Sequence, residues 1–292
     1  MCYYLHMSAS TSDGVATRRL PAGRKAELAA YVAEAGEVTV ARLAEQFDVS
    51  PDTIRRDLDQ LDADGVLIRT HGGAVSLTAL PRPDTGLDVR LRLRADAKEV
   101  IGQLAATLVE DNAALMVNGG TTTLALARHL RDRRELTIAT NSLRLPAEIS
   151  PQSVRDLYVF GGSVRLTAQA TVGPVGIPMS VSGGDLDIRC DLAFIGVGAV
   201  SADSGYSTSN LSEASMMAEM MRRASRVAVL ADSSKFGRRL FAQIADLDRA
   251  DYLITEEAPP ESLQDALDRA GVRVLHPGSV DVAPLPVRPE DD

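Results

Sequence analysis

The stretch from Ser50 to Val75, SPDTIRRDLDQLDADGVLIRTHGGAV, decides the fold of the first part of the chain. Its first residues predict the start of a helix, because the Ser50 hydroxyl can accept a hydrogen bond from a free backbone N–H and Pro51 suits the first helical position. Apolar residues then recur at helical spacing and predict one buried stripe, formed by Ile54, Leu58 and Leu61. We therefore expect a short, capped helix that packs through this stripe.

The opposite side of this helix carries Thr53, Arg55 and Arg56. Two adjacent arginines near the start of a capped helix are typical of a helix that reads the major groove of DNA. The alternative is a surface helix whose arginines pair with neighbouring acids, which are Asp52, Asp57 and Asp59. Taken alone, this helix leaves both interpretations open.

The segments before this helix predict a helix-turn-helix. Residues 42–47 form a short amphipathic helix, and residues 48–49 leave only a tight turn before Ser50. A longer helix over residues 24–35 precedes them and ends at Gly36.

The segments after this helix predict a wing. Residues 66–69 and 74–75 are two small strands joined through the glycines of His71-Gly72-Gly73. Winged helices lay such a hairpin along the phosphate backbone, and Arg69 and His71 suit that contact.

These motifs together resemble the DeoR family of bacterial transcriptional regulators. The resemblance rests on VTVARLAEQFDVSPDTIRRDLDQLDADGVLIRTHGGAV, in which TIRRDL and HGGA stand in one register. It implies sequence-specific binding to double-stranded operator DNA. The DNA-binding residues that we expect are Ser50, Asp52, Thr53, Arg55, Arg56, Arg69 and His71.

Composition limits how the chain can bind DNA. The net charge is −9, which argues against a generic nucleic-acid binder, and residues 18–75 carry eight basic against ten acidic residues. The positive surface must therefore be local, with Arg18, Arg19, Arg24 and Lys25 as further candidates. We expect weak non-specific binding and a dependence on specific contacts and on a homo-oligomer.

Length and cysteine content place the chain among two-domain cytoplasmic proteins. Its 292 residues suffice for two hydrophobic cores, and no long apolar run predicts a membrane span. Cys2 and Cys190 have no metal-ligand spacing, which suits a reducing cytoplasm, and we expect neither a metal nor a cofactor. Residues 1–17 have no signal-peptide pattern and are expected to be a disordered tail, with Met7 as an alternative start.

The composition changes after the wing and predicts a second domain. We expect a winged helix-turn-helix domain over residues 18–76, a linker over 77–89, an α/β sensor domain over 90–277 and a disordered tail over 278–292. Arg90 and Lys98 stand in a predicted helix, residues 90–111, at basic positions of the family pattern. Because this helix follows the linker, it is the expected path from sensor to winged helix.

Alternating apolar runs predict a Rossmann-like sensor domain with a mostly parallel sheet and helices on both faces. The predicted strands are ALMVN (114–118), LTIAT (136–140), LYVFG (157–161), DLAFIGVG (191–198), RVAVLAD (226–232), YLITE (252–256) and VRVLH (272–276). The predicted helices are residues 122–130, 143–149, 211–224 and 261–270.

Polar and glycine-rich residues follow several of these strands. Ligands of such sheets bind at the carboxyl ends of the strands, where free N–H groups and threonine hydroxyls can hold phosphate oxygens. An ordinary tight turn would use the same residues, but several such ends on one edge favour a small-ligand site. The strand-end residues of this site are Asn118, Gly120, Thr121, Thr122, Thr140, Asn141, Gly161 and Gly162.

Three charged residues accompany these strand ends. Lys235 is a candidate partner for a phosphate or carboxylate, although a solvated lysine is the simpler interpretation. Glu213, in the first turn of a predicted helix, could either bind a sugar hydroxyl or simply favour the helix dipole. Asp191 opens the DLAFIGVG strand, where a solvated turn carboxylate is the simpler interpretation.

The DeoR resemblance continues here through GTT, TNS, FGG, DLAFIG and DSSKFG, in family order. It implies a domain similar to sugar-phosphate isomerases that senses phosphorylated sugars or related metabolites, and a regulator, foremost a repressor, of carbohydrate genes. The family commonly has aspartate where this chain has Asn118, which loses a charge. The alternative function is a sugar-phosphate isomerase with an appended DNA-binding module, but Asn118 is not a base. A scaffold for protein partners is the third alternative, against which the TIRRDL and HGGA register argues.

Overall fold

The computed structural model describes residues 21–79, 85–175, 177–178, 185–186 and 188–279. The expected tail at 1–17, most of the expected tail at 278–292, linker residues 80–84, and Arg18 and Arg19 lie outside the described residues. The chain divides into two compact units, Met1–Ala79 and Leu80–Asp292. None of the described helices is long and apolar enough to cross a membrane.

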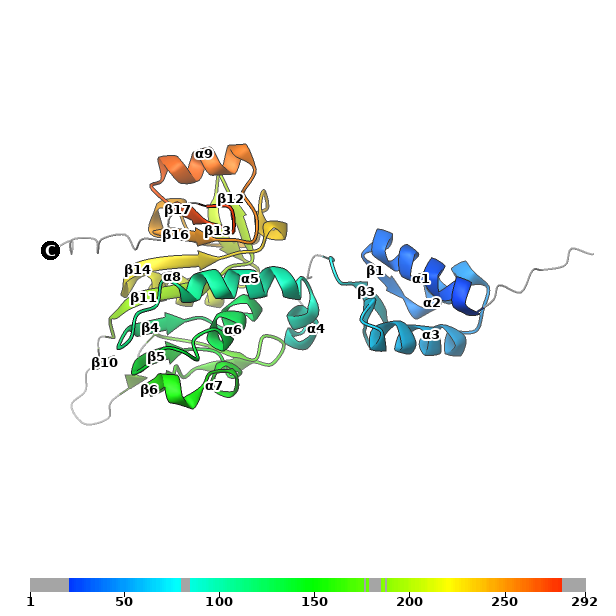
Figure 1. The fold of residues 1–292 in the computed structure, drawn as a ribbon, viewed down its shortest axis with the longest axis horizontal. Coiled ribbons are helices and arrows are strands. Elements are labelled where there is room, and N and C mark those ends of the chain that lie inside the picture. Colours follow the sequence, from blue (N-terminus) through cyan, green and yellow to red (C-terminus); the bar gives the residue numbers. More distant parts are fainter. Residues whose placement is uncertain (1–20, 80–84, 176, 179–184, 187, 280–292) are drawn as a thin grey trace, which may run out of the picture. The chain divides into compact units, whose positions relative to one another are not determined.

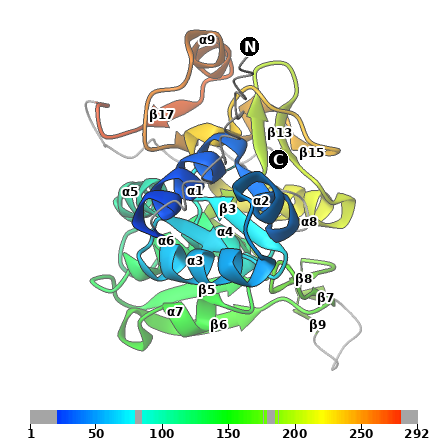
Figure 2. The same ribbon diagram turned by 90° about the vertical axis from the view of Figure 1, so that its right-hand side faces the viewer.

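The first unit is a winged helix-turn-helix, as predicted (Figures 1 and 2). Its elements are α1 (Pro21–Ala35), β1 (Glu37–Thr39), α2 (Val40–Phe47), α3 (Pro51–Ala63), β2 (Leu67–Arg69) and β3 (Gly73–Ser76). The three strands form an antiparallel sheet in the order β1-β3-β2. The β2–β3 wing was predicted, whereas β1 was not, because β1 leads directly into α2 at Val40 and no turn residues separate the two elements.

Local chemistry fixes the start of α3. The Ser50 side chain accepts a hydrogen bond from the Thr53 backbone N–H at 3.2 Å, as its N-cap position predicts. Asp48, with φ of 51°, makes the left-handed turn that ends α2. The predicted stripe is buried and packs on α1 and α2 in one core, which includes Leu28, Val32, Leu43, Ile54, Leu58 and Leu61.

The second unit is built on a seven-stranded, fully parallel sheet in the order β17-β16-β14-β11-β4-β5-β6. Its strands are β4 (Ala114–Val117), β5 (Leu136–Thr140), β6 (Val154–Val159), β11 (Cys190–Gly196), β14 (Ala224–Leu230), β16 (Tyr252–Ile254) and β17 (Arg273–Leu275). All seven predicted strands are confirmed. The chain leaves β4 toward β5 and β6 and later returns on the other side of β4 as β11, so the strand order reverses between β4 and β11.

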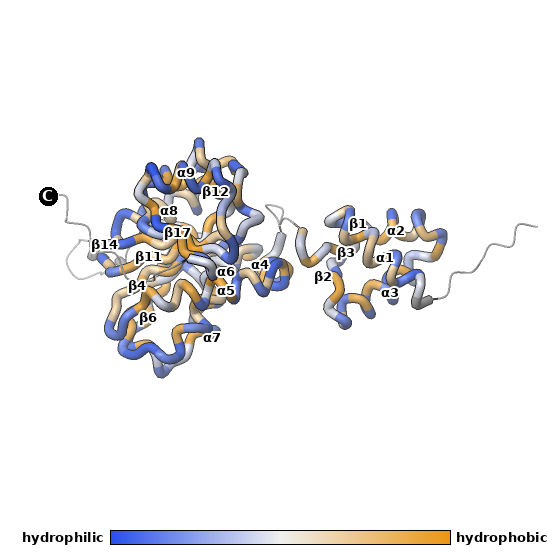
Figure 3. The backbone as a smooth tube through the Cα atoms, turned by 45° about the horizontal axis from the view of Figure 1, so that its top comes forward, coloured by the Kyte–Doolittle hydropathy of each residue, from blue (hydrophilic) through white to orange (hydrophobic). Residues whose placement is uncertain are grey.

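Helices cover both faces of this sheet (Figures 1 and 3). One face packs on α4 (Leu87–Arg92), α5 (Ala95–Ala106), α6 (Thr121–Arg128) and α7 (Leu145–Glu148). The other packs on α8 (Leu211–Arg222), α9 (Glu261–Arg269) and a small antiparallel sheet of β12 (Ala199–Ser201), β13 (Gly205–Thr208) and β15 (Ala242–Ala245). Shorter elements are β7 (Ser163–Arg165), β8 (Ala170–Val172), β9 (Ile177–Pro178), β10 (Asp185–Leu186) and the 3-10 turns Pro151–Ser153, Ser233–Lys235 and Leu247–Arg249.

Two helix predictions were wrong in extent. The single helix expected over residues 90–111 is two helices, α4 and α5, because Leu93 is extended and Arg94 adopts the left-handed conformation between them. The helix expected over 143–149 shrinks to α7, whose second residue is Pro146, a residue that helices accept in their first turn.

Candidate functional site

Helix α3, which the sequence predicts to read DNA and which we call the reader helix, exposes Arg55 and Arg56. Arg55 pairs with Asp52 through Nη1 and Oδ1 at 2.6 Å, so the alternative of local ion pairs holds for this residue. The pair is exposed, and an exposed pair contributes little free energy, so DNA can displace Asp52. Arg56 has no side-chain partner within the described residues.

The wing is anchored to the polar side of α3. Arg69 Nε lies 2.7 Å from Asp59 Oδ1, and the Arg69 backbone N–H donates to Asp62 Oδ1 at 2.9 Å. His71 is exposed in the turn that follows β2. Arg24, an additional DNA contact in the sequence interpretation, instead donates from Nε to the buried Asp57 at 2.7 Å and ties α1 to α3.

In the sensor unit, Asn118 lies at the point where the strand order reverses. Its Nδ2 donates to Gly196 O at 2.9 Å, and its Oδ1 accepts from Gly196 N at 2.8 Å. Both amide atoms are thus used to join the carboxyl ends of β4 and β11, and the side chain is fully buried. Asn118 therefore joins two strand ends, and its fully buried side chain is not exposed to a ligand.

The ends of β4 and β5 are joined in the same way. Asn141 Oδ1 accepts from Gly119 N at 2.7 Å while its Nδ2 donates to Thr171 O at 2.7 Å. The Thr140 hydroxyl donates to Val117 O at 2.6 Å. These expected effector residues therefore hold the strand ends in register.

The groups that remain for a ligand lie in the first turn of α6. Gly120 caps this helix without a side-chain hydrogen bond, and Thr121 and Thr122 follow it. The backbone N–H groups of a first helical turn lack helical partners and carry the positive end of the helix dipole, so this turn suits an anion. The Thr123 hydroxyl is used internally, since it donates to Asn118 O.

Gly161 and Gly162 turn the chain from β6 into the β7–β8 hairpin. Gly162 has φ of 128°, and a Cβ there would lie 2.3 Å from Val172 O. Both glycines are exposed, and the second is required by the close approach of β8.

A cluster of cations lies beside the carboxyl end of β14. Lys235 stands in the turn after β14, Lys98 on α5 and Arg90 on α4. Lys98 Nζ donates to Arg90 O and Leu93 O. Burial lowers the pKa of Lys98 to about 8, which nearby Asp232 opposes and the other cations reinforce.

The pKa values of Arg90 and Lys235 are lowered as well, and burial is the main reason for both. For Arg90, Glu213 opposes this shift and Arg165 adds to it. For Lys235, Asp232 opposes the shift and nearby arginines, including Arg90, add to it. Asp232, only 2% exposed, is the acid that stabilises the charge of both lysines. Buried cations that share one acid favour a bound anion.

Glu213 lies near Arg90 and is half-buried. It pairs with Arg165 and accepts a hydrogen bond from the Thr208 hydroxyl at 3.3 Å, and its charge acts on Arg90. Asp191 lies at the start of β11, where Oδ2 accepts from Ala114 N at 2.7 Å. Asp191 is therefore on the amino edge of the sheet, away from the strand ends.

Sequence reasoning left Arg90, Lys98, Arg94, Arg165 and Asp232 out of the candidate site. One signal was available for Lys98: it stands three residues before Ile101, on the apolar side of a predicted helix, where a charge needs a partner. Arg94 and Arg165 carry no such signal.

A winged helix-turn-helix with an exposed reader helix, followed by an α/β sensor domain, defines a DNA-binding transcriptional regulator. Two family models match the chain: the DeoR-like helix-turn-helix domain over residues 24–79 and the DeoR C terminal sensor domain over residues 93–257. The chain belongs to the DeoR family of transcriptional regulators, as the sequence motifs predicted.

Curated relatives match along nearly their whole length. The chain is 32% identical over 256 residues to the HTH-type transcriptional regulator GlpR of Haloferax volcanii, covering 88% of this chain and 98% of the relative. It is 31% identical to the HTH-type transcriptional repressor GlcR of Bacillus subtilis, covering 84% and 92%. A ribose 5-phosphate isomerase A structure from Methanocaldococcus jannaschii aligns with a TM-score of 0.34 at 16% identity, covering 50% of this chain and 56% of that one. A likeness of that size says nothing about activity.

Proposed function

We propose that the chain is a repressor of carbohydrate genes whose operator binding is controlled by a phosphorylated sugar or a related anionic metabolite. The observation that carries the effector class is the cluster of Lys98 and Lys235, which share Asp232, with Arg90 as a neighbouring cation of both lysines. An arriving phosphate would supply the negative charge that these buried cations lack.

The effector would bind between this cluster and the first turn of α6. Gly120, Thr121 and Thr122 would offer backbone N–H groups and hydroxyls to its oxygens, Lys235 a charged contact, and Glu213 a contact to its hydroxyls. Asn118, Thr140, Asn141, Gly161 and Gly162 would support this site through the strand ends that they fix.

Repression is supported by relatives that are named repressors, GlcR of Bacillus subtilis and CsqR of Escherichia coli. We further infer a homo-oligomer, because a single winged helix in a chain of net charge −9 would bind DNA weakly, and a cytoplasmic location, where operator DNA lies. Static light scattering at the concentration of operator titrations tests the oligomer, and a monomer with full operator affinity would contradict it.

A sugar-phosphate isomerase is the second candidate. Isomerisation needs a base next to the substrate carbon. Asn118 cannot serve, and the Glu213 carboxylate is engaged by Arg165 and Thr208. These contacts favour sensing over turnover.

A panel of sugar phosphates in a thermal-shift assay tests the effector class, because a ligand of the folded state raises the midpoint of unfolding. Uncharged sugars serve as controls. We expect stabilisation by phosphorylated compounds only and no chemical change in them after prolonged incubation. Stabilisation by the uncharged sugar alone would refute the anion site, and conversion of a sugar phosphate would make the chain an enzyme.

A further inference from the structure

The junction between α4 and α5 is held in an unusual backbone conformation. Arg94 has φ of 48° and ψ of 43°, in the left-handed region, and acts as the N-cap of α5 without a capping side-chain hydrogen bond. Residues other than glycine, asparagine and aspartate rarely adopt this conformation, which persists only where the surrounding structure holds it.

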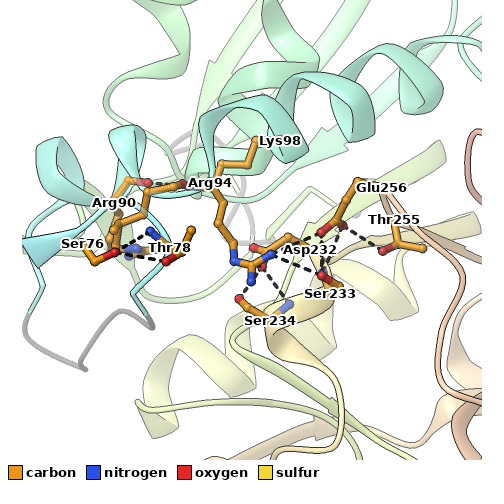
Figure 4. Close-up of polar contacts among 11 residues, drawn as sticks. Ser76, Thr78, Arg90, Arg94, Lys98, Asp232, Ser233, Ser234, Thr255 and Glu256 are labelled. Atoms are coloured by element: carbon orange, nitrogen blue, oxygen red, sulfur yellow. Dashed lines mark hydrogen bonds and ion pairs between the residues drawn. The ribbon is translucent and has the colours of Figure 1, made fainter. Parts of the chain in front are cut away.

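The Arg94 side chain is held by the carboxyl ends of two strands (Figure 4). Nη1 donates to the Ser233 hydroxyl at 3.3 Å and lies 3.6 Å from Glu256 Oε1. Nε lies 3.9 Å from Asp232 Oδ1, beyond hydrogen-bond distance. This buried Nε has no hydrogen-bond partner in the described part of the chain. The contact between Arg94 and Asp232 is thus incomplete.

Asp232 is shared between Arg94 and the cation cluster. It acts on Lys98 and Lys235, while its Oδ1 accepts hydrogen bonds from the backbone N–H and hydroxyl of Ser234. The turn that carries Lys235 begins directly after Asp232, so this short segment joins the proposed effector site to Arg94.

Resting on the proposed function, we infer that Arg94 couples the effector site to the α4–α5 junction. An anion bound by Lys98 and Lys235 takes over the role of Asp232 as their counter-charge. Asp232 then interacts more strongly with Arg94 and closes the 3.9 Å gap to Nε. Because Arg94 is also the backbone hinge, this closure moves α4 relative to α5.

Contacts at both ends of α4 link this helix to the proposed anion site and to the rest of the sensor unit. Lys98 Nζ donates to the carbonyls of Arg90 and Leu93, at the end of α4, so the same lysine contacts the proposed anion and this helix. At its other end, Leu87 N donates to Thr167 O at 2.9 Å. In the sequence, α4 is the first element of the sensor unit after the segment that joins the two units.

The test measures how a hexose 6-phosphate changes operator affinity in the full-length chain, by fluorescence anisotropy, for the parent, Arg94→Ala, Arg94→Lys and the control Arg155→Ala. Arg155 is an exposed arginine of β6 that pairs with Asp156. We expect a response of about 5–150-fold in the parent and the control. Arg94→Ala should keep parental operator affinity and bind the sugar phosphate, measured by calorimetry, yet lose the response.

The Arg94 variants also separate coupling from a structural role. Arg94→Lys keeps the charge but loses the planar fork, so an intermediate response is expected. Arg94→Gly should lose the response as well, yet unfold at a higher temperature than Arg94→Ala, because glycine accepts the left-handed conformation. A parental response in either folded variant, Arg94→Ala or Arg94→Gly, overturns the inference. A parent that answers no sugar phosphate overturns the proposed function and this inference with it.

Discussion

The two units of the chain use arginine and lysine in opposite ways. In the winged helix, Arg55, Arg56 and Arg69 are exposed, and the acids that pair with Arg55 and Arg69 stand within the same small domain. In the sensor, Lys98 is buried and Lys235 half-buried, and both share Asp232. Exposed cations in weak ion pairs with neighbouring acids suit DNA, a large polyanion that can displace those acids. Cations that are withdrawn from water and outnumber their acid suit a small anion that the protein encloses.

The reader helix gives the sharpest test of the exposed side of this comparison. The double change Arg55→Ala with Arg56→Ala should remove sequence preference, since each lost bidentate base contact costs about 1–3 kcal/mol. Effector binding by the sensor should be unchanged. Operator anisotropy titrations with a scrambled competitor measure the effect. Arg155→Ala, which changes an exposed arginine of the sensor unit, is the control, and parental discrimination in the double variant would show that α3 is not the helix that reads DNA.

Salt should separate the two kinds of site. Operator affinity should fall roughly threefold per neutralised phosphate between about 50 and 200 mM salt, because condensed counterions are released. Sugar-phosphate affinity should fall less, because buried charges are screened less than exposed ones. Parallel titrations over the same range measure both slopes. If both affinities fell equally steeply with salt, the cations of the sensor would be as solvated as those of the winged helix, and the difference between the two sites would not exist.

Alkaline pH should weaken the sensor selectively. Lys98 has a pKa lowered to about 8, so it loses its charge as the pH rises through that value. Anion affinity should drop roughly tenfold between about pH 7 and 9, whereas Lys98→Arg, which stays charged, should remain flat. The stability of the ligand-free protein should change in the opposite direction. Below about pH 8 the folded protein carries the cost of a charged, buried Lys98. Between about pH 8 and 10.5 the folded protein has lost this proton while the unfolded chain keeps it, so the cost disappears and the free energy of unfolding rises with pH. Calorimetric titration with the anion at both pH values measures the two affinities. An equal loss of anion affinity in the parent and in Lys98→Arg would show that Lys98 is not the group that titrates.

Asn118→Asp tests one contact inside the sensor. One carboxylate oxygen would face Gly196 O, where Nδ2 now donates, in a fully buried position, so we expect a loss of about 1–3 kcal/mol or more in the free energy of unfolding at neutral pH. The loss should shrink as acid protonates the new carboxyl, whose folded-state pKa would be raised. Asn112→Asp, at an exposed left-handed position, is the matched control. Urea unfolding that gives equal stability for the two variants would show that the Asn118–Gly196 contact adds nothing.

The sequence carried most of the fold because its signals are local. Ser50 and Pro51 mark the start of α3, and apolar runs bounded by glycine and polar residues mark the sheet strands. The break between α4 and α5 was not predictable in the same way. Leu93 and Arg94 suit a helix by propensity, and contacts with residues about 140 positions away stabilise the left-handed Arg94 instead.

The sequence predicted where the residues of the candidate site lie better than it predicted what their side chains bind. The carboxyl strand ends were expected to gather, and contacts between Asn118, Gly119, Asn141 and Gly196 join three of them. Their side chains, however, bind backbone groups of neighbouring strands, which no single-sequence pattern reveals. Lys98 and Arg90 come from helices that precede the sheet, so only the fold brings them beside Lys235.

Calorimetric titration of a stabilising sugar phosphate, with and without saturating operator DNA, tests the central claim most directly. If the sensor controls the winged helix, operator must change sugar-phosphate affinity by the same factor by which the sugar phosphate changes operator affinity, about 5–150-fold. Identical sugar-phosphate affinity in the presence and absence of operator would contradict the account.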